Sequence, residues 1–260
     1  MCLALLAHRV DPRHPLLLLG NRDEFHARPS AAAAPWPEDP RIVGGRDLQA
    51  GGAWLGLHAD GRFALVTNRR GPQAKPAPRS RGVLVRDYLL GDTDAADFAA
   101  RAAREHAAYG PFNLLLGDAM GNAFGVDGVS GHAFALEPGL HVISNGPWHA
   151  RWPKTERLRA GAAARLAAAD DDDALLDLLA DSTQPPDAAL PDTGVGLARE
   201  RLLAPIFIRG AQYGTRASSL VRVRDDGACD LRERHYGRDG TPQGEARWRR
   251  DPGAPRWAPD

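Results

Sequence analysis

The chain contains little cysteine and no long hydrophobic run. Its 260 residues include two cysteines, Cys2 and Cys229, too few for the disulfide framework of a small secreted protein. No apolar run approaches the roughly 20 residues that a membrane-spanning helix needs. The apolar residues at 3–7 are too few for a signal-peptide core, and no basic segment precedes them. We therefore expect a cytoplasmic protein without a membrane span.

The chain also lacks an excess of charge of either sign, because 33 basic residues balance 33 acidic ones. Without a positive field, nucleic acid is not the expected main partner. The nine histidines and two cysteines show no His-x-x-x-His or Cys-x-x-Cys spacing, so we expect no metal site and no cofactor. A small-molecule substrate or ligand is the expected partner, and no pattern indicates an oligomeric state.

The composition that remains is that of an ordinary globular protein, with 43% apolar and 25% charged residues. A length of 260 residues fits one large domain or two small ones. We predict a single domain over residues 1–260, with a flexible proline-rich tail from about residue 250.

The most informative stretch is the first 25 residues. An apolar run follows Cys2, a turn rich in proline and charge lies at 11–15, and a second apolar run covers 16–19. This pattern predicts two paired strands. The second strand ends in the polar cluster 21–24 (Asn-Arg-Asp-Glu), which would lie near Cys2 at the start of the first strand.

Cys2 could combine two catalytic roles. Removal of Met1 would leave a thiol and a free α-amine on this one residue, and an unperturbed α-amine titrates at about 7.7–8.0. The amine could then serve as the base for the thiol, without a separate histidine. Position alone favours another interpretation, in which Cys2 is a small buried apolar residue at the head of a strand.

The rest of the chain alternates between groups of strands and pairs of helices. Segment 27–41, rich in alanine and proline, is interpreted as an ordered loop or lid, and 182–200 as a loop. Strands are predicted at 53–58, 62–67, 112–116, 123–126, 132–136, 140–144, near 206, and at 216–223 and 229–236; helices are predicted at 80–91, 95–109, 153–166 and 174–179. The four strands between 112 and 144 are expected to form a meander. This order lacks βαβ alternation and indicates an α+β protein with antiparallel sheets stacked between helix layers.

Short polar clusters abut the ends of several predicted strands. They lie at Cys2, 21–24, 67–71 (Thr-Asn-Arg-Arg-Gly), 144–147 (Ser-Asn-Gly-Pro) and 213–216 (Tyr-Gly-Thr-Arg). In an antiparallel sandwich such ends can converge on one edge.

This set of motifs resembles the NRDE family, which is named for the stretch seen here at 21–24 and includes the eukaryotic transport and Golgi organisation protein 2. That family in turn resembles cysteine N-terminal-nucleophile hydrolases, the penicillin V acylases and bile salt hydrolases. Those enzymes hydrolyse amides and are four-layer αββα sandwiches. The resemblance therefore implies an α+β, four-layer αββα sandwich of antiparallel sheets and a C–N amide bond as the target.

The resemblance also implies roles for individual residues. Cys2 matches the nucleophile, Asp23 the aspartate that holds the free amine, and Asn145 the asparagine that donates to the oxyanion. Asn68 matches a second donor, and Arg216 the arginine beside the thiol.

Three further residues in the same clusters, Asn21, Arg22 and Arg69, are expected to contact substrate. One position departs from the acylases, which carry an arginine three residues before the aspartate, where this chain has Gly20. Arg22 is the candidate replacement.

Other functions remain open. Asn145 before Gly-Pro is also typical of a turn, and Asp23 could simply pair with Arg22. The whole fold could serve in small-molecule binding or trafficking without turnover, including haem handling with Cys2 or a histidine at the iron, although no haem motif is present. A third alternative is a redox-sensing thiol.

Overall fold

The computed structural model describes residues 2–71, 77–168 and 171–260, which form two stacked seven-stranded antiparallel sheets. The first sheet has the strand order β10-β1-β2-β11-β12-β13-β14, and the second runs β3-β4-β5-β6-β7-β8-β9. The strands of the first sheet are β1 (Cys2–Asp11), β2 (His14–Phe25), β10 (Gly139–Ile143), β11 (Tyr213–Val223), β12 (Cys229–Tyr236), β13 (Pro242–Arg250) and β14 (Ala258–Pro259). Those of the second are β3 (Ser30–Pro35), β4 (Ile42–Asp47), β5 (Leu55–His58), β6 (Phe63–Asn68), β7 (Phe112–Gly117), β8 (Ala123–Asp127) and β9 (His132–Ala135).

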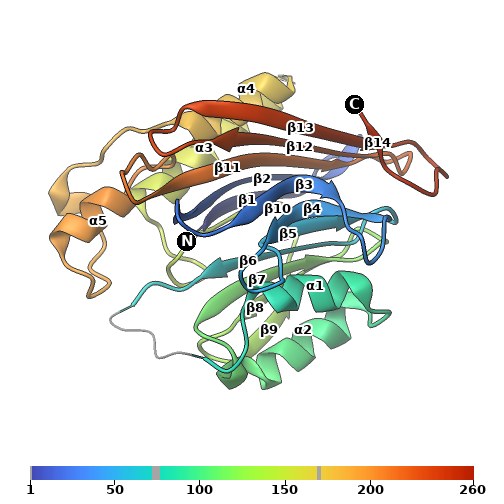
Figure 1. The fold of residues 1–260 in the computed structure, drawn as a ribbon, viewed down its shortest axis with the longest axis horizontal. Helices are drawn as coiled ribbons and strands as arrows, with labels where there is room; N and C mark the ends of the chain where they lie inside the picture. Colours follow the sequence, from blue (N-terminus) through green and yellow to red (C-terminus); the bar gives the residue numbers. More distant parts are fainter. Residues whose placement is uncertain (1, 72–76, 169–170) are drawn as a thin grey trace.

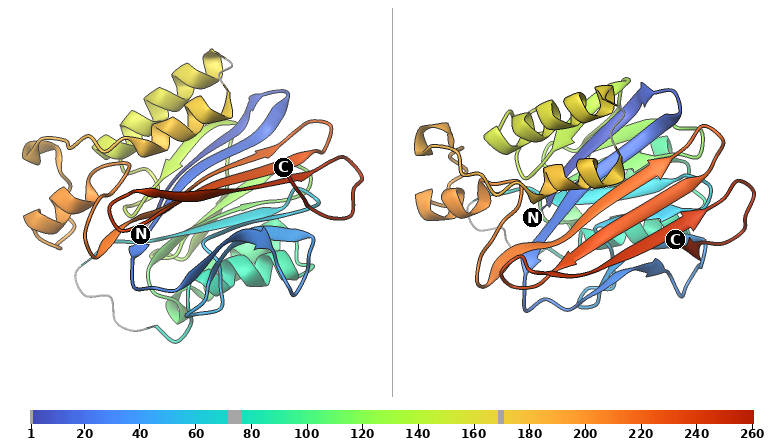
Figure 2. Two further views of the ribbon diagram at one scale, coloured as in Figure 1. Left: turned by 45° about the horizontal axis from the view of Figure 1, so that its top comes forward. Right: turned by 90° about the horizontal axis from the view of Figure 1, so that it is seen from above.

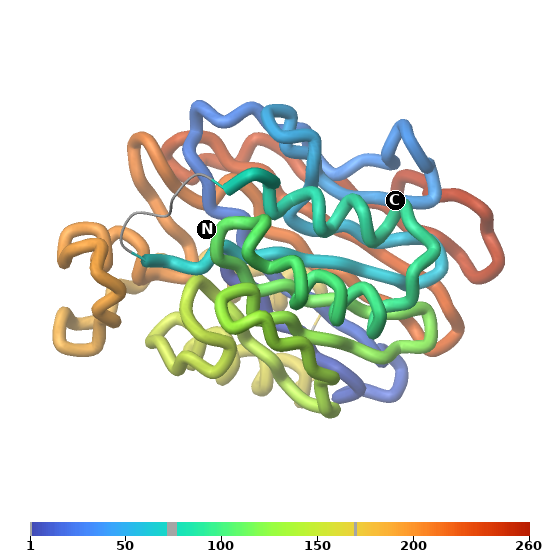
Figure 3. The backbone as a smooth tube through the Cα atoms, turned by 90° about the horizontal axis from the view of Figure 1, so that it is seen from below, coloured from blue at the N-terminus to red at the C-terminus, as the bar shows by residue number. Residues whose placement is uncertain are grey.

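Helices cover the outer face of each sheet, so the molecule has four layers. Helices α1 and α2 lie against the second sheet, and α3 and α4 against the first (Figure 1). Seen from above, α3 and α4 cross the strands of the first sheet (Figure 2), and from below α1 and α2 cover the second (Figure 3). The helices are α1 (Gly82–Leu90), α2 (Ala95–Arg104), α3 (Pro153–Ala167), α4 (Asp172–Asp177) and α5 (Leu197–Leu203), with short 3₁₀ turns η1 (His106–Ala108), η2 (Leu178–Ala180) and η3 (Asp187–Ala189). The predicted αββα sandwich is confirmed.

The uninterrupted apolar sequence of strand β1 is explained by burial on both of its faces. Successive side chains of a strand point to opposite faces of its sheet. Here Cys2, Ala4 and Leu6 pack between the two sheets. Leu3 and Leu5 pack on the other face, in the core that α3 and α4 complete. Both faces are buried, so no polar alternation is needed.

Most predicted elements are present, and the helix boundaries follow the expected signals. Helix α2 begins after Asp94, whose side chain accepts a hydrogen bond from the Asp97 amide at 2.9 Å. This is the N-cap role that its sequence position predicts. Helix α3 begins at Pro153, a favourable first helical residue.

Four predictions differ from the structure. Segment 27–41 contains strand β3, and 182–200 contains η3 and the start of α5. The residues near 206 are a buried loop rather than a strand. The meander ends at β9, because β10 crosses to the first sheet and pairs with β1. For β3 and β10 the difference comes from pairing with a strand elsewhere in the fold, which the local sequence does not indicate.

The segment after residue 250 is packed against the sandwich. Strand β14 pairs with β13, and the buried Trp257 side chain donates to the Arg41 carbonyl at 2.7 Å. Across the described residues, no helix is long and apolar enough to cross a membrane.

A close backbone contact fixes the start of α1 beside the segment that leads into β5. The Ala53 amide donates to the Gly82 carbonyl at 3.1 Å. A Cβ added to Gly52 would lie 2.4 Å from the Gly82 carbonyl carbon. Only glycine at 52 therefore allows this approach.

We predict that Gly52→Ala lowers the free energy of unfolding by about 1–3 kcal/mol, because the new methyl group must displace backbone. Urea unfolding would measure the change. Gly71→Ala is the matched control, since nothing in the described part of the chain lies within 4 Å of a Cβ there. Equal stability of the two variants would show that this contact is not restrictive.

Candidate functional site

The Cys2 thiol lies at the end of β1, directly opposite Arg22 of β2. Cys2 is only 7% exposed. It lines a cavity of about 100 Å³, here called the thiol cavity. Burial and the negative charge of Asp23 raise the pKa of Cys2; Arg22 and a hydrogen bond from the Asp23 amide act in the opposite direction. The pairing of β1 with β2 thus brings a cation and an amide donor to the sulfur.

Asp23 lies beside Cys2 and is almost fully buried. Its Oδ1 accepts a hydrogen bond from Thr215 Oγ1 at 2.7 Å, and its main-chain carbonyl accepts one from the Tyr213 hydroxyl at 2.8 Å. Burial raises the pKa of this carboxyl group, while the positive charge of Lys154 lowers it. The cluster 213–216 therefore holds Asp23 in place.

A buried group of charges lies behind Asp23. The Lys154 ammonium is buried and donates to the Leu203 carbonyl at 3.1 Å. Arg70 forms a buried ion pair with Glu200 and lies over the Trp152 ring at 4.9 Å. Lys154 and Arg70 both interact electrostatically with Asp23. Arg70 belongs to the predicted cluster 67–71, whereas no sequence motif indicated Lys154.

The asparagines of the site are joined by hydrogen bonds. Asn145 Nδ2 donates to the Asn68 carbonyl at 2.8 Å, and Ser144 Oγ donates to the Cys2 carbonyl at 3.3 Å. Asn113 Nδ2 in turn donates to the Ser144 and Gly146 carbonyls at 3.1 and 3.0 Å. Asn68 lines the thiol cavity, whereas Asn145 lies fully buried behind it.

Three other predicted residues are engaged elsewhere. Asn21 is fully buried, and its amide donates to the Leu179 and Ile206 carbonyls at 2.8 and 2.9 Å. Arg69 forms an ion pair with Asp127 at 3.1 Å.

Arg216 donates to the carbonyls of Phe25, His26 and Arg28 at 3.1–3.3 Å. It lines another cavity of about 320 Å³, here called the Arg216 cavity, which shares Arg22, Asp47 and Trp54 with the thiol cavity. The structure thus gathers Cys2, Asp23, Asn68 and Arg22 at one cavity, with Asn145 behind it. It gives Asn21 and Arg216 other contacts, while Arg69, although paired with Asp127, lines the larger cavity described below.

The position where the acylases carry arginine is filled differently here. A Cβ on Gly20 would lie 3.1 Å from both the Leu3 carbonyl oxygen and the Trp54 ring. Residues two apart on a strand share a face, so Gly20 and Arg22 point the same way. Trp54 therefore covers the Gly20 position, and Arg22 is the arginine opposite the thiol.

A larger cavity of about 540 Å³, here called the outer cavity, lies next to the thiol cavity. Glu24, Asn68 and Arg81 line both cavities. The remaining wall includes the apolar side chains Phe25, Val195, Leu202 and Leu203. A ligand could thus lie in the outer cavity and reach Cys2.

Sequence reasoning missed Lys154, Glu200 and Arg81. Lys154 carried one usable signal, since it is one of two lysines in an arginine-rich chain and opens a helix after Pro153. Glu200 lay in a segment interpreted as a loop and Arg81 at the start of the predicted helix 80–91, and nothing in the sequence distinguished either residue. Within the described residues no group of three or more His, Cys, Asp or Glu side chains could hold a metal ion.

We predict that Lys154 makes stability depend on pH. Burial lowers its pKa to about 8, while the unfolded lysine titrates at about 10.4. Between these values the unfolded state binds more protons, so the lysine's contribution to the free energy of unfolding rises with pH. The stability of the wild type relative to Lys154→Met should increase by about 3 kcal/mol from pH ~7 to ~11.

Urea unfolding of both proteins across this range would measure that difference. Taking the difference cancels the titration of the other groups that both proteins share. A constant difference would mean that Lys154 keeps an ordinary pKa.

Comparisons with known proteins agree with this architecture. The family model described as Transport and Golgi organisation 2 matches residues 1–238. The human Transport and Golgi organization protein 2 homolog is 32% identical over 257 residues, covering 90% of this chain and 92% of its own. The Mus musculus homolog is 31% identical over 260 residues, with the same coverage.

Among solved structures, a mutant conjugated bile acid hydrolase from Clostridium perfringens superposes with a TM-score of 0.50 and 10% identity, covering 89% of this chain and 88% of its own. At that identity the likeness shows the fold, which is that of an N-terminal-nucleophile hydrolase. The match over residues 1–238 and the identity to the two mammalian homologs establish the family. The chain belongs to the Transport and Golgi organisation 2 family.

Proposed function

We propose that, after removal of Met1, the protein is an amidohydrolase that uses Cys2 to cleave the C–N amide bond of a small acylated substrate. The observation that carries this proposal is the placement of the Cys2 thiol, in a cavity, opposite Arg22 and within hydrogen-bond reach of the Asp23 amide. A buried cysteine with a purely structural role would need neither the cavity nor the cation.

The reaction would proceed in two steps. The free α-amine of Cys2 takes the thiol proton, and the sulfur attacks the substrate carbonyl carbon. The C–N bond then breaks, the amine leaves with the proton, and a thioester remains on Cys2. Water attacks this thioester, which releases the carboxylic acid and returns the thiol.

The surrounding residues support this sequence of steps. Asn68 on the cavity wall is the candidate donor to the oxyanion, and a single donor of this kind is worth about 2.7–4 kcal/mol. Asn145 donates a hydrogen bond to the Asn68 carbonyl and so helps to position the chain segment that carries Asn68. Arg22 takes the place beside the thiol that the sequence motif assigned to Arg216. Asp23, which lines the same cavity as Cys2, is the candidate to hold the free amine.

A second candidate function is ligand binding without turnover. The outer cavity of about 540 Å³ with its apolar wall and the names of the mammalian homologs favour it. Haem is one ligand to test: a Soret shift on titration that Cys2→Ala abolishes would support haem binding through the thiol. No shift at micromolar haem would count against it.

We predict that Cys2 reacts with iodoacetamide faster than Cys229 at every pH. Burial raises the pKa of both thiols, but Cys2 lines a cavity whereas Cys229 is fully buried, so the reagent has access only to Cys2. Mass spectrometry of the two cysteine peptides would give both rates. Faster reaction of Cys229 would mean that the thiol cavity does not admit small reagents.

The same spectra report the N-terminus of protein from its native host. The proposed mechanism requires that Met1 be absent, because a peptide bond would otherwise occupy the α-amine of Cys2. Retention of Met1 in all of the native protein would exclude the hydrolase and leave binding as the function. Cys2→Ala should abolish any amidase activity, with Cys229→Ala as the matched control.

A further inference from the structure

Six arginines line the thiol and outer cavities: Arg22, Arg28, Arg69, Arg70, Arg81 and Arg199. Arg22 lies opposite the Cys2 thiol, and three of the others are paired. Arg28 forms a two-point contact with Asp47 at 3.1 and 2.6 Å, and Arg70 and Arg69 pair with Glu200 and Asp127 as described above. Arg81 forms no ion pair within the described residues, and its one hydrogen bond there is from Nη1 to the Pro111 carbonyl at 3.3 Å. Its charge is therefore available to a ligand.

The environment of Arg81 makes that charge costly to leave without a counter-ion. The residue is half-buried, and burial lowers the pKa of its guanidinium, while Glu24 and Cys2 raise it. A guanidinium has five N–H donors, of which this one uses a single donor on the protein. An anion placed there would gain charge-assisted hydrogen bonds in a region already partly free of water.

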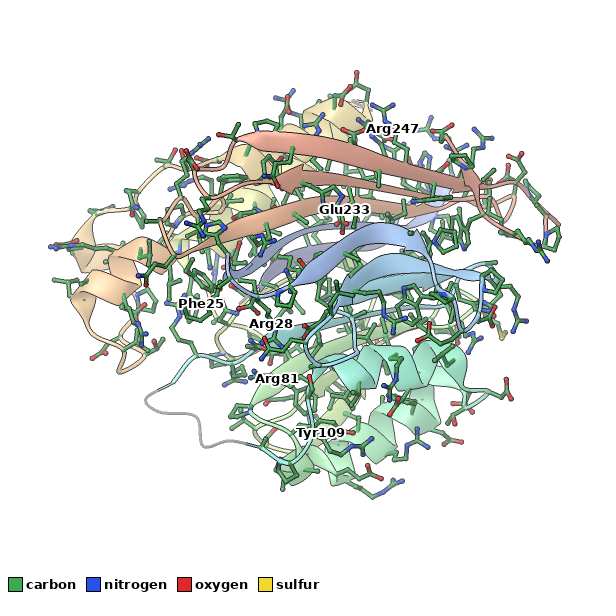
Figure 4. The ribbon with its side chains drawn as sticks, in the orientation of Figure 1. Phe25, Arg28, Arg81, Tyr109, Glu233 and Arg247 are labelled. Carbon is green, nitrogen blue, oxygen red and sulfur yellow. The ribbon has the colours of Figure 1, made fainter. Side chains whose placement is uncertain are left out.

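An anion bound at Arg81 would lie near the thiol of Cys2. Arg81 lines the thiol cavity with Cys2 and also lines the outer cavity with Phe25. Figure 4 shows Phe25, Arg28 and Arg81 at the same edge of the sandwich. The residue cannot easily withdraw, because Gly52 and Gly82 hold the start of α1 in close contact.

We propose that Arg81 binds a carboxylate of the ligand next to Cys2. For a substrate, this inference rests on the proposed hydrolase function and deepens it. The thiol cavity of about 100 Å³ has room for only a few heavy atoms, so the carboxylate is separated from the scissile amide by few bonds. The apolar part of the molecule then lies in the outer cavity, against Leu202 and Leu203.

Neighbouring charges favour a carboxylate over a dianion such as phosphate. Glu24 lines both cavities with Arg81, and its carboxylate lies 3.8 Å from Arg28. Asp23 and Asp47 add two further carboxylates to the thiol cavity, against the three guanidinium groups of Arg22, Arg28 and Arg81. Because these charges balance, the site suits a ligand with one negative charge better than a ligand with two.

The first test compares two alkylating reagents of similar size on Cys2. Iodoacetate carries a carboxylate and iodoacetamide does not, while both react with the thiolate. The ratio of their rates at one pH is independent of the thiolate fraction, so any effect of a mutation on the pKa of Cys2 cancels. Peptide mass spectrometry would give the rates.

The expected result is a fall in the iodoacetate-to-iodoacetamide ratio of about tenfold in Arg81→Gln. Arg79→Gln is the control, because Arg79 pairs with Asp87 on the surface and lines neither cavity. Arg81→Lys should keep part of the preference, because it keeps the charge. If the ratio in Arg81→Gln equals that of the wild type, the proposal is wrong.

A measurement on the wild type tests the proposal without depending on whether a variant folds. Acetate should slow the alkylation of Cys2 by iodoacetamide more than an equal concentration of neutral acetamide does. Equal effects of the two would overturn the carboxylate site without any mutation.

The second test separates this inference from the hydrolase proposal. An N-acylglycine and its carboxamide analogue would be compared as substrates of protein lacking Met1, in the wild type and Arg81→Gln. Loss of the preference for the acid in the variant supports both proposals. If both compounds are cleaved with a ratio that Arg81→Gln leaves unchanged, the hydrolase proposal stands and the Arg81 proposal fails. If neither is cleaved while the alkylation ratio falls, the carboxylate site stands and the hydrolase proposal loses its support.

Discussion

The pairing of β1 with β2 is the constraint on which the site depends. Its register places Arg22 opposite Cys2, and the pleat then directs these two side chains to one face and Asp23 to the other. Each face meets a different environment. The thiol and its arginine lie between the sheets, beside the cavity, while the carboxylate lies toward the helix layer that contains Lys154. A shift of one residue in this register would exchange the two faces and separate the thiol from its cation.

Much of the fold could be predicted from local patterns. The apolar runs on either side of the turn at 11–15 predicted β1 and β2, and Asp94 and Pro153 predicted the starts of α2 and α3. The strand at 140–144 was also predicted. Its partner was not, because β10 leaves the meander for an edge of the other sheet, and strand order depends on which edges remain open. Strand β3 was missed because its alanines and prolines favour a loop when they are considered alone.

The residues of the candidate site could also be predicted only in part. Clusters at strand ends indicated the residues that converge, and Cys2, Asp23, Asn68 and Asn145 do lie together. The same reasoning could not separate side chains that face the cavity from those turned inward or toward other partners. Asn21 binds two carbonyls in the core, and Arg216 supports the chain at 25–28. The charges behind Asp23 come from Lys154, Arg70 and Glu200, whose proximity arises only from the packing of α3 and α5 against the strand ends.

The surroundings of Cys2 are assembled from distant parts of the chain. Thr215, which holds Asp23, lies in β11, and β11 pairs along most of β2. Such non-local pairing forms late, since a long loop must close first. A chain emerging from the ribosome therefore exposes its first residues until more than 200 others have been made. If Met1 is removed, as the proposed mechanism requires, the first residues would be accessible to an aminopeptidase during synthesis, before Cys2 is buried. Under that mechanism the order of translation and folding would govern how much of the protein carries a free cysteine amine.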